Sequence, residues 1–137
     1  IVIVVRFILA LLIGTFAGAA VNGSLIVLGG MIFQLPKGVG FDTPAALDAF
    51  RTLPVKYYLF PFLAHAIGTL TACLVALRIT ISHAAWVTYP IAYLFFIGGI
   101  VAVDMINAPV WFDILDLSFA YIPMAWLAMQ SRLAKKS

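Results

Sequence analysis

Residues 57–81 read YYLFPFLAHAIGTLTACLVALRITI, and Arg78, near the end of the run, is the one side chain in it with a permanent charge. About 20 consecutive apolar residues in a helix are enough to cross the hydrocarbon core of a bilayer. Three further runs of comparable length lie elsewhere in the chain, at about 7–33, 85–106 and 112–131. The sequence therefore predicts an all-α polytopic membrane protein, in which residues 1–137 form a single four-helix transmembrane domain.

Composition excludes a water-soluble protein. Hydrophobic residues make up 65% of the chain and charged residues 9%, with a mean hydropathy of +1.16, whereas about a quarter of the residues in soluble domains are charged. The runs are continuously apolar and lack the alternation of outer-membrane strands, which favours helices over a β-barrel. The net charge of +3 comes from loops and tails that orient the spans. The expected partner is therefore the lipid bilayer and not a nucleic acid.

The first apolar run shares features with a cleavable signal peptide. Arg6 precedes an apolar stretch, and small residues follow at positions 17–19. Hydrophobicity then resumes from Val21 to Phe33, which extends beyond the apolar region of a signal peptide. We therefore expect an uncleaved first transmembrane helix.

Lysine and arginine residues divide between the two sides of a four-span arrangement. On one side lie Arg6, Arg78, Arg132, Lys135 and Lys136. On the other side lie Lys37, Arg51 and Lys56. Short cytoplasmic segments are enriched in positive residues, so we expect both termini on the cytoplasmic side of a bacterial-type inner (plasma) membrane. The loop of about 34–56 and the turn around Asn107 then lie outside.

The outer loop carries the signature of a short helix. Thr43 followed by Pro44 is typical of a helix start, because threonine caps the first amides and proline fits the first turn. Leu47, Phe50 and Leu53 then recur every three residues, as on one face of a helix. We expect a short helix lying on the membrane, which either covers the mouth of the bundle as a lid or anchors the loop at the interface.

Two spans carry small residues at a four-residue spacing, which lets neighbouring helices approach closely. These residues are Gly14, Gly18 and Asn22 on the first span and Gly68, Ala72 and Ala76 on the second. Proline interrupts three of the four spans, at Pro61, Pro90 and Pro123. Because proline lacks an amide proton and clashes with the preceding turn, we expect kinks at these positions.

Polar side chains within the spans gather in the outer half of the bundle. His65 lies about eight residues below Tyr57, or about 12 Å at the rise of an α-helix. Polar groups in hydrocarbon are costly and normally face the bundle interior in pairs. We expect Asp116 to be the most buried aspartate, and Asp113 to be a helix-start carboxylate favoured by the macrodipole. The expected binding pocket consists of His65, Asn22, Asp116, Asp104 and Thr69.

This polar cluster leaves more than one function open. In the first, an outward-facing pocket binds or translocates a small solute, proton or cation, and a pore would need a homo-oligomer because four helices are few. The aromatic residues expected to close this pocket below are Phe95, Phe96, Tyr93 and Tyr121. In the second, the chain is an accessory subunit packed on other membrane subunits, and the cluster holds its helices together. An exposed surface rich in Gly and Ala would support that function.

No cofactor is identified by the sequence. A metal site formed by His65 with Asp104 and Asp116 is chemically reasonable, because imidazole and carboxylate groups are common ligands. The ligand spacing of known metal motifs is missing, however. The nature of any bound metal or cofactor is therefore left open.

A third function is an intramembrane aspartate-dependent hydrolase. Residues 112–116, Phe-Asp-Ile-Leu-Asp, resemble the Phe-x-x-x-Asp shape of one catalytic box in the lipoprotein signal peptidases. Those enzymes are also small four-span proteins, and the resemblance implies catalysis by a pair of aspartates. The first box of that family, with Asn and Arg framing its aspartate, is absent between Gly98 and Asp104. The Asn of the second box is Asp113 in this chain.

Overall fold

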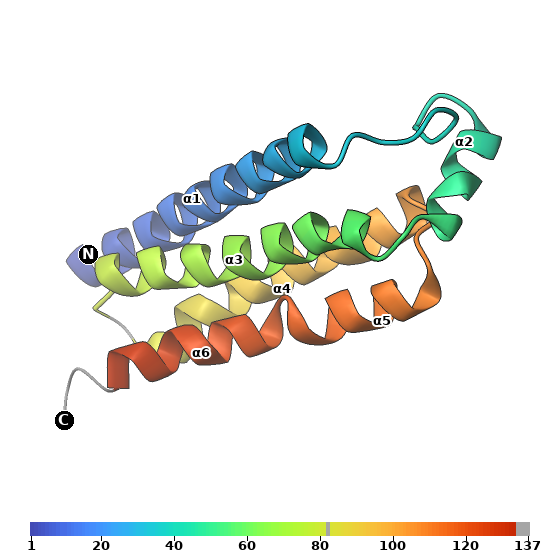
Figure 1. Cartoon of the computed structure of the whole chain (residues 1–137). Coiled ribbons are helices and arrows are strands. Elements are labelled where there is room, and N and C mark those ends of the chain that lie inside the picture. Colours follow the sequence, from blue (N-terminus) through green and yellow to red (C-terminus); the bar gives the residue numbers. More distant parts are fainter. Residues whose placement is uncertain (82, 134–137) are drawn as a thin grey trace.

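The computed structural model describes residues 1–81 and 83–133, and these residues form helices and connecting segments without a strand (Figure 1). In chain order the elements are α1 (Val2–Ile32), α2 (Pro44–Asp48), the 3₁₀-helix η1 (Ala49–Thr52), α3 (Lys56–Ile79), α4 (Ala84–Met105), α5 (Val110–Phe119) and α6 (Ile122–Leu133). Helices α1, α3 and α4 are each long and apolar enough to cross a membrane, and α5 with α6 forms a fourth such segment. The prediction of an all-helical fold with four segments able to span a membrane is confirmed for the described residues.

The start of α1 and the end of α6 lie at one end of the bundle, which we call the chain-terminal end, and α2 and η1 lie at the other, which we call the loop end (Figure 1). At the first of these ends, Arg6 Nε donates a hydrogen bond to the carbonyl oxygen of Ile79, at 2.9 Å, and so joins the start of α1 to the end of α3. Lys135 and Lys136, which contribute to the predicted orientation, lie outside the described residues. The side of the membrane that each end faces stays a prediction.

The two predicted faces of small residues pack against one another along α1 and α3. A Cβ atom built on Gly14 would lie 2.7 Å from the carbonyl oxygen of Ala72, and one built on Gly68 would lie 3.0 Å from the Cβ atom of Asn22. Gly18 lies between these two levels and faces both Ala72 and Gly68. Helices in lipid associate through such close packing, because the bilayer provides no hydrophobic force between them.

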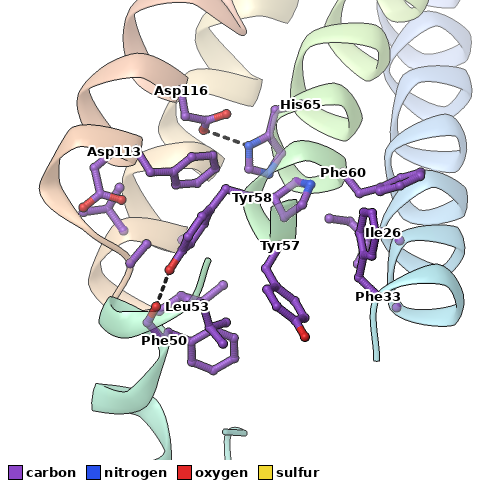
Figure 2. A pocket seen from close by; sticks show the side chains of 18 of the residues that line it. Ile26, Phe33, Phe50, Leu53, Tyr57, Tyr58, Phe60, His65, Asp113 and Asp116 are labelled. Carbon is purple, nitrogen blue, oxygen red and sulfur yellow. Dashed lines mark hydrogen bonds and ion pairs between the residues drawn. The ribbon is translucent and has the colours of Figure 1, made fainter. Parts of the chain in front are cut away.

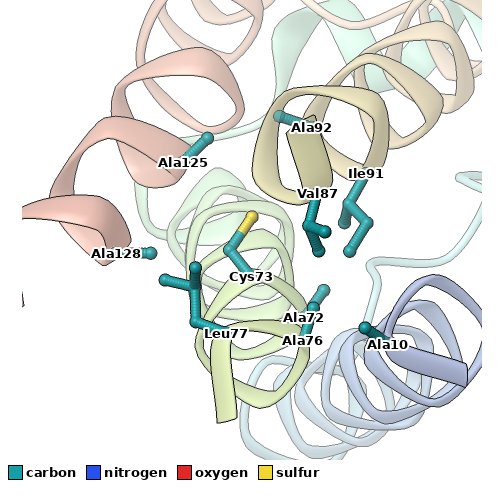
Figure 3. Packing of buried hydrophobic residues seen from close by; sticks show 10 residues of the cluster. All are labelled: Ala10, Ala72, Cys73, Ala76, Leu77, Val87, Ile91, Ala92, Ala125 and Ala128. Carbon is teal, nitrogen blue, oxygen red and sulfur yellow. The ribbon is translucent and has the colours of Figure 1, made fainter. Parts of the chain in front are cut away.

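Small side chains also fill the centre of the bundle towards the chain-terminal end (Figure 3). The buried cluster there consists of Ala10, Ala72, Cys73, Ala76, Leu77, Val87, Ile91, Ala92, Ala125 and Ala128. It receives side chains from α1, α3, α4 and α6. This half of the bundle is therefore packed with apolar atoms, as expected from the scarcity of polar residues in the inner half of the spans.

The fourth span is broken between α5 and α6, and Pro123 is the physical reason. Proline at this position has no amide proton to donate to the carbonyl group of Phe119, and its ring clashes with that turn. Helix α5 accordingly ends at Phe119, and α6 begins at Ile122. By contrast, α3 and α4 continue through Pro61 and Pro90 as single helices.

A short helix forms in the loop after α1, as predicted, and the 3₁₀-helix η1 that follows it contacts the bundle. Thr43 Oγ1 accepts a hydrogen bond from the amide of Ala46 at 3.2 Å, and Pro44 occupies the first turn. Phe50 is buried, and its carbonyl oxygen accepts a hydrogen bond from the hydroxyl group of Tyr58 on α3. The position of the loop helix α2 on the membrane surface stays a prediction. The contacts of Phe50 place η1 against the bundle.

A matched pair of glycine substitutions on α1 should have different effects on the free energy of unfolding. Gly18→Ala places a Cβ atom 2.5 Å from both Ala72 Cβ and the Gly68 carbonyl oxygen, so we expect a loss of about 1–3 kcal/mol from overpacking. Gly23 has open space around it, so Gly23→Ala should be neutral or stabilise the helix by up to about 1 kcal/mol. Unfolding of both variants in detergent measures this difference, and equal destabilisation would contradict the packing described here.

Cysteine labelling should test the orientation. In a background with Cys73→Ala, a membrane-impermeant maleimide should label Lys37→Cys in intact spheroplasts, because the loop is expected outside. Ser131→Cys, near the end of α6, should react only after the membrane is permeabilised. The opposite labelling pattern would show that the orientation is the reverse of the predicted one, with the fold unchanged.

Candidate functional site

A cavity of about 250 Å³ lies within the loop end of the bundle (Figure 2). Its walls come from α1, α3, α4 and α5, and Phe50 and Leu53 line it from the segment that precedes α3. Aromatic rings form much of the lining, namely Phe33, Phe41, Phe50, Tyr57, Tyr58, Phe60 and Phe112. In Figure 2, His65 and Asp116 lie at the opposite end of the cavity from Phe50 and Leu53. We call the part next to His65 and Asp116 the deep end.

A hydrogen-bonded group of three side chains marks the deep end. His65 Nδ1 lies 2.8 Å from Asp116 Oδ2, and the Tyr121 hydroxyl group donates to the same oxygen at 3.0 Å. Asp116 is 3% exposed and Tyr121 is 1% exposed. The rings of His65 and Tyr121 lie with their centroids 5.7 Å apart. One carboxylate oxygen therefore holds both hydrogen bonds that the described residues make to this side chain.

The second carboxylate oxygen of Asp116 has a different environment. Oδ1 is buried, and within the part of the chain that the structure describes no donor hydrogen-bonds to it. Asp116 also lines the cavity. A buried oxygen without a hydrogen bond is unfavourable, by about 1–3 kcal/mol in typical proteins and by more for a charged group. Asp116 is therefore a cavity-lining residue with one carboxylate oxygen that the described residues leave without a donor.

Local structure explains how these three side chains meet. The bend between α5 and α6 carries Tyr121 back towards Asp116. Gly99 on α4 makes room for the phenol, because a Cβ atom at this position would overlap the Tyr121 hydroxyl group. On α3, Thr69 Oγ1 donates to the carbonyl oxygen of His65 at 2.8 Å. Residues far apart in the sequence are thus brought to one point by a helix break and a glycine.

The structure separates the predicted pocket residues into two groups. His65 and Asp116 are in contact and line the cavity. Asn22 is half-buried against Gly68, Thr69 is buried with its hydroxyl group bonded to the backbone, and Asp104 is exposed. None of these three residues is part of the cavity lining.

Other residues of the site differ from the sequence-based expectation. Asp116 is the most buried aspartate, as predicted, but Asp113 also lines the cavity in addition to standing in the first turn of α5. Tyr121, which we expect to close the pocket below, also bonds directly to Asp116. Tyr93 is 58% exposed and so faces away from the bundle interior. The spacing of Asp116 and Tyr121, five residues apart across a proline-induced break, was the available signal for their contact.

The metal and hydrolase alternatives depend on how the acidic groups are placed. Among residues 1–81 and 83–133, no group of three His, Cys, Asp or Glu side chains is close enough to hold a metal ion. Asp104 does not line the cavity, so Asp113 and Asp116 are the two carboxylates that do. Comparison with protein-family models, curated proteins and solved structures gives no match. The chemistry of the cavity is therefore the basis on which we infer a function.

A double-mutant cycle should measure the contact between His65 and Asp116. The variants His65→Ala and Asp116→Asn, alone and combined, should give a coupling free energy of about 1 kcal/mol, because the two side chains share one hydrogen bond. The matched cycle of His65→Ala with Asp104→Asn should give coupling within about 0.3–0.5 kcal/mol of zero, as for independent sites. Unfolding in detergent provides the free energies. Equal coupling in the two cycles would contradict the geometry of the site.

Proposed function

We propose that the protein binds a small, mainly apolar molecule in the loop-end cavity, with a polar group of that molecule placed at His65 and Asp116. The observation that carries this proposal is the distribution of polarity: the walls are largely aromatic and aliphatic, and polar side chains converge at the deep end. Ligand pockets in proteins commonly combine apolar walls with a few well-placed polar groups. On the predicted orientation the cavity lies on the outer side of the membrane.

The size of the cavity limits the ligand. An apolar cavity of about 150 Å³ is known to admit benzene, and this cavity measures about 250 Å³. It therefore suits a molecule somewhat larger than a single six-membered ring. The ligand would meet the rings of Tyr58 and Phe112, whose centroids lie 4.9 Å apart.

Binding is better supported than passage through a continuous channel. The chain-terminal half of the bundle is filled by the buried cluster around Cys73. Phe95 and Phe96 pack against Tyr121, and Phe95 also packs against that cluster. Translocation by this chain would therefore require a rearrangement of the helices or a second copy of the protein.

An accessory subunit of a larger membrane complex is the second candidate. Its supporting observation is that Gly23 is exposed on α1 with open space around it, as on a face that receives a partner helix. Against it, many large apolar side chains face outward, as expected for contact with lipid. On α1 and α4 these include Leu12, Phe16, Val27, Met31, Leu94 and Ile97.

Native mass spectrometry of protein extracted gently from its own membrane should detect a retained small molecule. The variant Ala102→Phe places a ring in the cavity lining and should lose that molecule. Val101→Phe is the matched control, because Val101 is 49% exposed and outside the lining, and it should retain it.

Two results would count against the proposal. One is equal retention by Ala102→Phe and Val101→Phe, which would place the molecule elsewhere on the protein. The other is the absence of any small molecule together with foreign chains at fixed stoichiometry, which would favour the accessory-subunit function.

A further inference from the structure

We propose that the ligand of this cavity is a lipophilic amine in its protonated form, which donates an N–H hydrogen bond to Asp116 Oδ1 and places its apolar body against the aromatic walls. This inference rests on the proposed function and names the chemical class of the ligand. It is carried by three features of the described residues, namely an unpartnered carboxylate oxygen, the sign of the charges in the lining and the aromatic rings around them.

The unpartnered oxygen requires a hydrogen-bond donor. Asp116 is only 3% exposed, and its Oδ1 atom has no hydrogen-bond partner among the described residues. The donors supplied by the protein, His65 and Tyr121, both contact Oδ2. Asp116 lines the cavity, but Oδ1 itself has almost no accessible surface, so a ligand at the deep end supplies the missing donor when the carboxylate turns slightly towards it. An ionised carboxylate only accepts hydrogen bonds, so a ligand carrying acceptors alone would leave Oδ1 unsatisfied.

The charges in the lining favour a cation over an anion. Asp113 and Asp116 both line the cavity, and none of the lining residues is Lys or Arg. His65 can share one positive charge with Asp116, but Asp113 is a second carboxylate on the same helix. The positive groups nearby lie towards the other end of the cavity, which we call the rim. There Arg51 interacts electrostatically with Asp113, and Lys56 lies over the rings of Phe33 and Tyr57. A carboxylate or phosphate ligand would be repelled at the deep end.

A charged donor also gains more than a neutral donor at this site. Hydrogen bonds between an ammonium group and a carboxylate are roughly twice as strong as those between neutral groups. A carboxylate within a membrane protein is costly unless a partner compensates its charge. An amine cation would provide both the donor and the compensating charge for Asp116, whereas an alcohol would provide only the donor.

The aromatic walls suit the same class of ligand. Cations are attracted to ring faces within about 6 Å of the centroid. The rim contains an example within the protein, because the Lys56 ammonium group lies 5.7 Å from the centroid of Phe33 and 5.2 Å from that of Tyr57, and both rings line the cavity. Tyr58 and Phe112 present further rings to the cavity, with their centroids 4.9 Å apart. The apolar part of an amine would pack against these rings.

Three probes of similar shape separate these contributions. We would measure the affinities of 2-phenylethylamine, its N,N,N-trimethyl derivative and 2-phenylethanol for the full chain in nanodiscs of zwitterionic lipid, by isothermal titration calorimetry at neutral pH. The amine carries both charge and N–H donors, the trimethyl derivative carries charge alone, and the alcohol carries a donor alone. We expect the amine to bind about tenfold more tightly than either of the others, or by a larger factor, because only the amine makes a charge-assisted hydrogen bond.

Two substitutions test whether the preference for the amine comes from the Asp116 side chain. Asp116→Asn should weaken amine binding by about tenfold or more and leave the alcohol nearly unchanged, because the charge on the acceptor is lost. Asp42→Asn, which neutralises an exposed aspartate of the loop, should leave the affinities of all three probes as in the wild type. If Asp116→Asn does not fold, the comparison of the three probes on the wild-type protein still tests the inference.

Failure of this inference and failure of the proposed function give different results. If the alcohol or the trimethyl derivative binds as tightly as the amine, and Ala102→Phe abolishes that binding, the cavity binds ligands but the preference for a protonated amine is wrong. If no probe binds, or if Ala102→Phe leaves binding unchanged, both the amine class and the binding function of the cavity are overturned.

Discussion

The close contact between α1 and α3 is the constraint on which the rest of the structure depends. It extends from Gly14, opposite Ala72, to Gly29, where a Cβ atom would overlap the side chain of Phe60. Without side chains at these glycines the two backbones can approach as closely as helix packing in lipid requires. Held in this position, the end of α1 forms one wall of the cavity through Ile26 and Phe33, and α4 and α5 provide walls from other directions (Figure 2).

The polar group at the deep end depends on two departures from regular helix packing. Pro123 ends the hydrogen-bond ladder of the fourth span, so that the chain bends and Tyr121 reaches Asp116. Gly99 provides the space for the Tyr121 phenol on α4. Both departures would weaken an isolated helix, since glycine and proline are poor helix formers in water. Here they bring donors to a carboxylate that would otherwise lie in apolar surroundings.

A purely structural role for the hydrogen-bond network accounts for only one of the two carboxylate oxygens of Asp116. Interhelical hydrogen bonds in membrane proteins contribute about 0.6 kcal/mol each, and the contacts of Oδ2 with His65 and Tyr121 are of this kind. A group serving only to join helices would gain nothing from an unpartnered Oδ1 beside a cavity. Burial of a charged group without its full set of hydrogen bonds is a cost that ligand binding can offset. This difference between the two oxygens is the reason for preferring a binding site.

The sequence by itself determined the helices, the spans and the small-residue faces, because hydrophobic run length and residue spacing act locally along the chain. It also identified His65 and Asp116, since ionisable groups in apolar runs stand out wherever they point. Only the tertiary structure decided that Asp104, Asn22 and Thr69 lie outside the cavity lining, and that Tyr121 and Asp113 belong to the site. Rotation of each helix about its axis and the bend before Pro123 set these positions, and both arise from packing between helices distant in sequence.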